Sequence, residues 1–253
     1  MTDDRRKAMR ELITEKLNVR VQELQERFPD VSVMTIRRDL AALEAEGSII
    51  RTRGGARVNG QVLGIAEDMY SRREQAHVEA KRLISEKAAA FVEEKRSIFL
   101  DAGTTVMKLA QRIPDENLVL FTTAPNIALE VVRRTQKPQV TLLGGNLSRN
   151  TLSASGRAAL DYLRSINIDV AFMATSAFSP ESGFTSGDPY EAELKTEVIR
   201  KSRRVIMLMT TEKADRNMPY TFAQMSDLDV LICEERPNET LMRLASEHGV
   251  VVL

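Results

Sequence analysis

Thr35, Arg37 and Arg38 carry side chains suited to hydrogen-bond with base edges and phosphate oxygens of DNA. They lie in a segment that predicts a helix from about Ser32 to Glu46, because Ser32 is a favourable N-cap residue. An apolar stripe at helical spacing is formed by Ile36, Leu40 and Leu43. The pattern predicts a helix that buries this stripe and presents its basic N-terminal half to the major groove.

A basic turn follows this helix. Residues 48–51 and 56–58 predict two short strands, and Arg53 with two glycines predicts the tight turn between them. With two helices predicted upstream, residues 1–57 form a winged helix-turn-helix domain. A paired arginine is often only a solvated helix face and a double glycine only a turn, but their order here favours DNA binding. The expected contact residues are Ser32, Thr35, Arg37, Arg38, Arg51, Arg53, Gly54 and Arg57.

The composition is that of an ordinary globular protein, and the length allows either one large domain or a small domain plus a medium one. Of 253 residues, 43% are hydrophobic and 28% charged, and 36 basic residues balance 36 acidic ones. This balance excludes a generally basic, nucleic-acid-coating surface, so locally placed arginines must supply any attraction to DNA. With one cysteine, two distant histidines and no long apolar run, we expect no disulfide, metal, cofactor or membrane span, and a cytoplasmic location.

After a linker predicted over residues 58–76, short apolar strands alternate with amphipathic helices. This alternation predicts an α/β domain with a largely parallel sheet over residues 77–253. The expected strands lie at 98–100, 118–121, 140–143, 170–173, 205–208, 230–232 and 250–253.

Polar loops follow several of these strands, where binding sites of parallel sheets lie. Glycines, hydroxyls and a lysine there could bind an anion, although a strand followed by glycine and threonine is often only a helix entry. The candidate residues are Asp101, Gly103, Thr104, Thr105, Thr122, Thr123, Gly144, Gly145 and Lys213. Their repetition at successive strand ends favours a phosphate-binding site.

Nearly the whole chain resembles the DeoR family of bacterial sugar-operon regulators. The family patterns V-S-x-x-T-I-R-R-D-L, L-E-x-x-G-x-I and the G-G-A wing are matched from Val31 to Ala56. In the second half, the D-x-G-T-T loop is matched at 101–105, the later G-G pair at 144–145 and the lysine of D-x-x-K at Lys213. The chain departs from the family at Arg53, usually His or Tyr, at Thr123, usually Asn, at Thr210, usually Asp, and at 175–177, which lack the usual glycine.

The resemblance implies a fold shared with ribose-5-phosphate isomerase and a phosphorylated sugar as effector. It also makes Glu191 and Lys195 possible residues of the pocket rim, although Glu191 could equally complement the dipole of the helix that it begins. The implied partners are double-stranded operator DNA and copies of the same chain, as a homodimer or homotetramer. The function expected is repression of a carbohydrate uptake or catabolism operon, relieved by the effector.

The sequence supports two other functions less well. A sugar-phosphate isomerase needs a positioned base, but the stretch 174–178, where related isomerases carry acidic residues, has no carboxylate. Asp101 could be imagined as a base, yet it could equally order its loop. A module that binds protein through its helix-turn-helix would leave Arg37, Arg38 and Arg53 without an evident role. We therefore expect a regulator rather than an enzyme.

Overall fold

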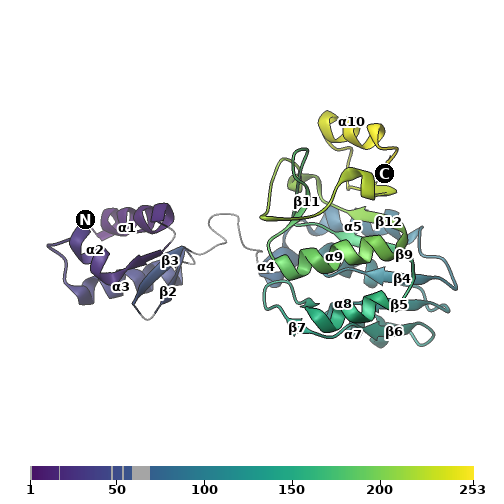
Figure 1. Cartoon of the computed structure of the whole chain (residues 1–253), viewed down its shortest axis with the longest axis horizontal. Coiled ribbons are helices and arrows are strands. Elements are labelled where there is room, and N and C mark those ends of the chain that lie inside the picture. The colour runs from purple at the N-terminus through teal and green to yellow at the C-terminus, as the bar shows by residue number, and fades with distance from the viewer. Residues whose placement is uncertain (1, 17, 47, 53, 59–68) are drawn as a thin grey trace. The chain divides into compact units, whose positions relative to one another are not determined.

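The computed structural model describes residues 2–16, 18–46, 48–52, 54–58 and 69–253 (Figure 1). Contacts divide the chain into two compact units, Met1–Ala66 and Glu67–Leu253, and we describe each by itself. The predicted linker therefore contributes to the second unit, because Tyr70–Gln75 form the helix α4 there. The rest of that linker, from 59 to 68, lies outside the described residues.

The first unit is a winged helix-turn-helix. Its elements are α1 (Thr2–Lys16), β1 (Asn18–Arg20), α2 (Val21–Arg27), α3 (Val33–Ala45), β2 (Ile49–Thr52) and β3 (Gly55–Val58). The strands form an antiparallel sheet in the order β1-β3-β2. The predicted stripe on α3 packs into a core that includes Met9, Ile13, Leu24, Ile36, Leu40 and Leu43. The helices and the wing are thus confirmed, whereas the three-residue strand β1 was not predicted.

The second unit is built on a parallel sheet of seven strands in the order β15-β14-β12-β9-β4-β5-β6. These strands are β4 (Ser97–Leu100), β5 (Val119–Thr122), β6 (Gln139–Leu142), β9 (Ile168–Ala174), β12 (Ser202–Leu208), β14 (Val230–Ile232) and β15 (Val251–Val252). All seven match predicted strands within a few residues, and the sheet is entirely parallel.

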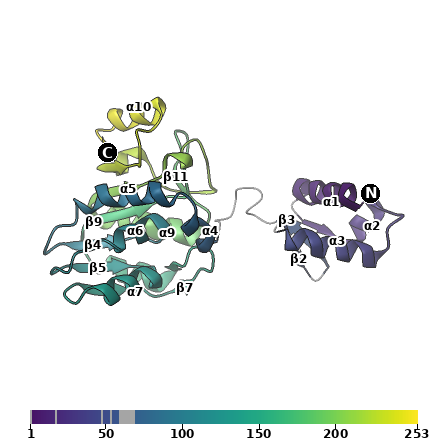
Figure 2. The same cartoon turned by 180° about the vertical axis from the view of Figure 1, so that it is seen from behind.

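Helices cover both faces of this sheet (Figures 1 and 2). The helices are α5 (Val78–Ala89), α6 (Thr104–Ala110), α7 (Pro125–Arg134), α8 (Arg157–Arg164), α9 (Pro189–Lys201) and α10 (Glu239–Glu247). Side chains of β4 alternate between two cores, with Phe99 packing in the core of α8 and α9 and Ile98 and Leu100 in the core of α5 to α7. Burial on both faces explains why the strands read as short, continuous apolar runs.

Shorter elements surround the ends of the strands. They are the hairpin β7 (Asn146–Leu147) and β8 (Ala154–Ser155), the small sheet of β10 (Ala177–Ser179), β11 (Gly183–Ser186) and β13 (Tyr220–Ala223), and the 3₁₀ turns η1 (Thr211–Lys213) and η2 (Met225–Asp227). The chain adds strands from β4 to β6 in one direction and from β9 to β15 in the other. The ends of β4 and β9 therefore form the switch point, where ligands of such sheets bind.

The close packing of the wing against β1 can be tested by substituting its two glycines. A Cβ on Gly55 would lie 2.0 Å from the carbonyl oxygen of Val19, whereas one on Gly54 would meet nothing within 4 Å. We expect Gly55→Ala to destabilise the first unit by about 2 kcal/mol or more, because the two backbones must separate. Gly54→Ala is the matched control and should be nearly neutral. Hydrogen exchange of the first unit measures both, and equal protection in the two variants would contradict the close approach of β1 and β3.

Candidate functional site

The outward face of α3 carries the predicted DNA-contacting residues. The Ser32 hydroxyl accepts a hydrogen bond from the Thr35 amide at 3.2 Å, which confirms Ser32 as the N-cap. Arg37 and Arg38 are exposed, one turn into the helix. Met34 lies on the same face and is 75% exposed, an apolar group that sequence reasoning missed. This face therefore offers two guanidinium groups, a hydroxyl and a thioether to a partner.

The inner face of α3 is held by an acidic residue. Asp39 is fully buried, and its carboxylate accepts hydrogen bonds from Arg5 at 2.7 Å and from Arg6 at 3.2 Å, both in α1. Burial alone would raise the pKa of Asp39, but the hydrogen bonds and charges of the two arginines outweigh it and hold the pKa below its usual value. Asp39 therefore fixes α3 against α1 while the next two residues toward the N-terminus face outward.

The wing residues differ in how far the structure describes them. Arg51 donates to the Glu44 carboxylate at 2.7 Å, so its side chain is paired with the end of α3. Gly54 is exposed, and its carbonyl accepts a hydrogen bond from the Val21 amide at 2.9 Å. Arg53 lies outside the described residues, as does the side chain of Arg57. DNA contact by these residues stays a prediction.

A polar cleft lies at the carboxyl ends of the central strands of the second unit, which we call the strand-end cleft. It is lined by Arg73, Ala102, Gly103, Thr104, Thr105, Ala174, Thr175, Ser176, Glu191, Lys195 and Lys213. The structure thus brings together five of the predicted effector-binding residues, Gly103, Thr104, Thr105, Lys195 and Lys213. Gly103, Thr104 and Thr105 follow β4, and Lys213 follows β12, whereas Lys195 lies in α9. The lining residues Ala174 to Ser176 come from the end of β9, which lies between β4 and β12 in the sheet.

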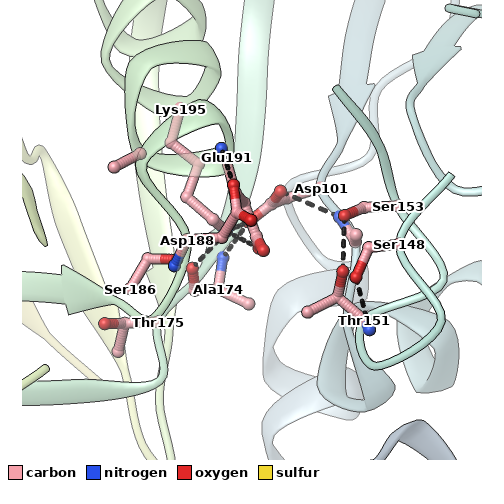
Figure 3. Close-up of polar contacts among 12 residues, drawn as sticks. Asp101, Ser148, Thr151, Ser153, Ala174, Thr175, Ser186, Asp188, Glu191 and Lys195 are labelled. Atoms are coloured by element: carbon pink, nitrogen blue, oxygen red, sulfur yellow. Dashed lines mark hydrogen bonds and ion pairs between the residues drawn. The ribbon is translucent and has the colours of Figure 1, made fainter. Parts of the chain in front are cut away.

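A buried ion pair joins Asp101 to Lys195, one of the residues that line the strand-end cleft (Figure 3). The Asp101 carboxylate bonds to the Lys195 ammonium, and the two residues are only 1% and 2% exposed. Asp101 also accepts hydrogen bonds from the amides of Ala102 at 2.8 Å and Ala174 at 2.9 Å. Lys195 donates to the Ala174 carbonyl at 2.8 Å and lies 3.6 Å from the Glu191 carboxylate. The charge of Lys195 is therefore balanced within the protein.

Two further cationic side chains, far apart in the sequence, line the cleft. Lys213, in η1, donates to the Thr175 carbonyl at 2.7 Å. Arg73, in α4, donates to the Asn150 carbonyl at 3.2 Å. Arg73, Thr175 and Ser176 were not proposed as site residues. Nothing in the spacing of Arg73 from the other residues points to the cleft, because it precedes the whole sheet.

The remaining predicted effector residues are not among those that line the cleft. The Thr122 hydroxyl accepts a hydrogen bond from the Ala124 amide at 3.1 Å, and the Thr123 carbonyl accepts one from Ala154 at 2.8 Å. A Cβ on Gly145 would lie 2.4 Å from the Ser155 carbonyl oxygen, so this glycine permits the β7–β8 hairpin to close, while Gly144 beside it is exposed. These residues shape the loops around the cleft.

Three further features concern the cysteine, metal-binding groups and membrane-spanning helices. Cys233 is fully buried, and burial raises the pKa of its thiol to about 12, so it is a structural thiol. In the part of the chain that the structure describes, no group of three or more His, Cys, Asp or Glu side chains is placed to hold a metal ion. Among the described helices, none is both long and apolar enough to cross a membrane.

A winged helix-turn-helix unit followed by a separate α/β unit defines the class of two-part transcriptional regulators. Residues 5–62 match the family model of the DeoR-like helix-turn-helix domain, and residues 76–235 match that of the DeoR C-terminal sensor domain. The chain therefore belongs to the DeoR family of transcriptional regulators.

Three curated proteins illustrate how far the similarity extends. The chain is 32% identical to the HTH-type transcriptional regulator GlpR of Haloferax volcanii, covering 99% of this chain and 96% of that protein. It is 30% identical to the lactose phosphotransferase system repressor of Streptococcus mutans, covering 98% of each. It is 26% identical to the glycerol-3-phosphate regulon repressor of Escherichia coli, covering 95% and 94%. Ribose-5-phosphate isomerase A of Methanocaldococcus jannaschii gives a TM-score of 0.40 at 11% identity over 55% of each chain.

The role of Asp39 is tested by Asp39→Asn. The neutral amide keeps the shape but loses the charge-assisted bonds from Arg5 and Arg6, so the first unit should lose about 2 kcal/mol of stability and bind DNA more weakly. Asp30→Asn, an exposed carboxylate before α3, is the control and should change neither property. Hydrogen exchange of α1 and α3 measures the loss.

The same variant has a pH dependence of known sign. Because the pKa of Asp39 lies below its usual value of 3.8 in the folded state, its contribution is complete above about pH 3.8. The contribution is lost as the pH falls through the lower folded value, so wild type and Asp39→Asn should converge in acid. If the difference in stability between wild type and Asp39→Asn stays constant as the pH falls below about 3.8, the ionised carboxylate does not stabilise the first unit.

The ion pair in the cleft is tested by single and double substitution. Lys195→Met leaves the Asp101 carboxylate buried without its counter-ion and should cost about 3–5 kcal/mol. Adding Asp101→Asn should recover a part of that loss, because the buried charge is then gone. Unfolding can be followed by tyrosine fluorescence, since all four tyrosines lie in the second unit. Additive losses would show that the two groups do not act as a pair.

Proposed function

We propose that this protein is a repressor of a carbohydrate uptake or catabolism operon, and that a phosphorylated sugar in the strand-end cleft releases it from its operator. The observation that carries the proposal is the presence, in one chain, of an exposed basic recognition helix and a separate cleft lined by cations and hydroxyls. The names of the similar proteins, which include repressors of lactose and glycerol-3-phosphate systems, support the same function.

The cleft chemistry suits a monophosphate ester of a polyol. Arg73 and Lys213 supply two cations, and the nearby Thr104 and Ser176 supply hydroxyls for a sugar. Together with Lys195, which pairs with Asp101 and Glu191, these two cations would attract a phosphate to the cleft. Asp101, Thr122, Thr123, Gly144 and Gly145 would then act by shaping the site, with Gly103 and Thr105 at its wall.

The DNA-binding side of the proposal requires two copies of the first unit. Arg37 and Arg38 would contact bases and phosphates in the major groove, with Met34 placed to meet an apolar base edge such as the thymine methyl group. Ser32 and Thr35 would lie at the same end of α3, and the wing residues would follow the backbone. A helix-turn-helix reads paired half-sites, so we propose a homodimer or homotetramer.

An isomerase activity is less well supported by the site. The carboxylate that could serve as a base, Asp101, accepts two backbone amide bonds and pairs with Lys195. A base with those partners is poorly placed to take a proton from a substrate.

The proposal is tested on DNA from upstream of the protein's own gene, by fluorescence anisotropy with a panel of sugar phosphates. Arg38→Ala should weaken DNA binding about tenfold and reduce its salt dependence, while leaving effector binding unchanged. Lys213→Ala should weaken effector binding and leave DNA binding unchanged. Lys7→Ala and Lys137→Ala, exposed charges elsewhere in the respective units, serve as controls.

The outcomes separate the two sites. Relief of specific binding by one sugar phosphate identifies the effector class and supports both halves of the proposal. Equal loss of both activities in either variant would point to damaged folding, and no specific DNA binding under any condition would overturn the proposal. An isomerase assay on the same panel would then be decisive.

A further inference from the structure

The short helix α4 has a place in the second unit that its sequence position does not suggest. It is the first described element of that unit, and it directly follows residues 59–68, through which the chain continues from the helix-turn-helix unit. It also contributes Arg73 to the strand-end cleft, to which Lys213 comes from η1, after β12. One element thus belongs both to the cleft and to the chain that leads to the other unit.

A buried lysine holds the end of α4. Lys81, in α5, is 4% exposed, and its ammonium donates to the carbonyl oxygens of Arg73 and, at 2.6 Å, Ala76. Carbonyls in the last turn of a helix have no donor within the helix, so they need such a partner. The acceptor on Arg73 is the backbone of the same residue whose guanidinium lines the cleft. Burial lowers the pKa of Lys81 to about 8. The two hydrogen bonds offset the free-energy cost of burying the charged ammonium.

A second contact joins the α4–α5 junction to the other cationic side of the cleft. His77, which separates the two helices, adopts a left-handed backbone conformation with φ of +50°. Its Nε2 atom lies 2.5 Å from the carboxylate of Glu212, the residue before Lys213 in η1. The chain segments that carry Arg73 and Lys213 are therefore tied to each other through their neighbours.

We propose that Lys81 is a positioning residue that fixes α4 so that Arg73 and Lys213 bind one anion together, and that anion binding strengthens the docking of α4. This inference rests on the proposed anion site. A ligand that binds only when α4 is docked must stabilise the docked state, because it contributes binding free energy to that state alone. Docking of α4 then determines the point at which the chain that leads to the helix-turn-helix unit leaves the second unit.

The test is hydrogen exchange of the full chain, measured by mass spectrometry with inorganic phosphate as the probe and chloride at equal ionic strength as reference. In the wild type, phosphate should slow exchange in residues 70–77, together with the cleft segments after β4 and β12. Lys81→Met should exchange about tenfold faster in residues 70–77 without phosphate and bind phosphate about tenfold more weakly. The helix α10 reports on global stability and should not change.

Lys87→Met is the matched control. Lys87 lies in the same helix and also donates to backbone carbonyls, those of Cys233 at 2.7 Å and Glu234 at 3.3 Å, but it makes these bonds beyond β14. This variant should leave both α4 exchange and phosphate affinity unchanged.

Three results would overturn the inference in different ways. Uniformly faster exchange in Lys81→Met, with α10 affected as much as α4, would make Lys81 an ordinary stabilising residue. Slowing by phosphate of the cleft segments without residues 70–77 would refute the coupling to α4 while leaving the anion site intact. No slowing anywhere in the wild type would overturn the anion site itself, and the coupling with it.

Discussion

A buried carboxylate between two strands is the constraint on which the second unit depends. Asp101 directly follows β4, and by accepting the Ala174 amide it joins the end of β4 to the end of β9, where the strand order reverses. Its charge must be balanced in an environment with almost no water, and Lys195 on α9 supplies the counter-charge. The ion pair therefore fixes the ends of β4 and β9 and the covering helix α9 relative to one another beside the cleft.

The first unit also buries a carboxylate that must be balanced by positive charge. Its buried carboxylate, Asp39, is balanced by Arg5 and Arg6 of α1, and this pairing sets the rotation of α3. Arg37 and Arg38 are adjacent in sequence to Asp39 but point to solvent. Within one short run, the acidic residue thus holds the helix while the basic residues are exposed. In the second unit, Lys195 pairs with Asp101, while Arg73 and Lys213 donate to backbone carbonyls at the cleft.

Elements marked by an apolar run or stripe could be predicted, and elements without one could not. The stripe of Ile36, Leu40 and Leu43 identified α3, and buried apolar runs identified all seven strands of the parallel sheet, although several have only two to four residues. The missed elements mix polar and apolar residues without such a run or stripe: β1, β7, β8, β10, β11, β13 and α4. Five of the predicted effector residues line the strand-end cleft, and their role in binding stays a prediction. Thr122 and Thr123 are not among the lining residues and instead accept hydrogen bonds from the amides of Ala124 and Ala154.

The sequence by itself determined the two-unit organisation, the winged helix-turn-helix, the parallel sheet and the position of polar loops at strand ends. These properties depend on periodicity, capping and turn chemistry, which act over a few neighbouring residues. Only the tertiary structure decided which polar groups meet. Lys195 reaches Asp101 across 94 residues of sequence, and Arg73 enters the cleft because Lys81 holds α4 there. Such pairings depend on which helices pack beside which strand ends, and the burial that makes their charges costly exists only once the chain has folded.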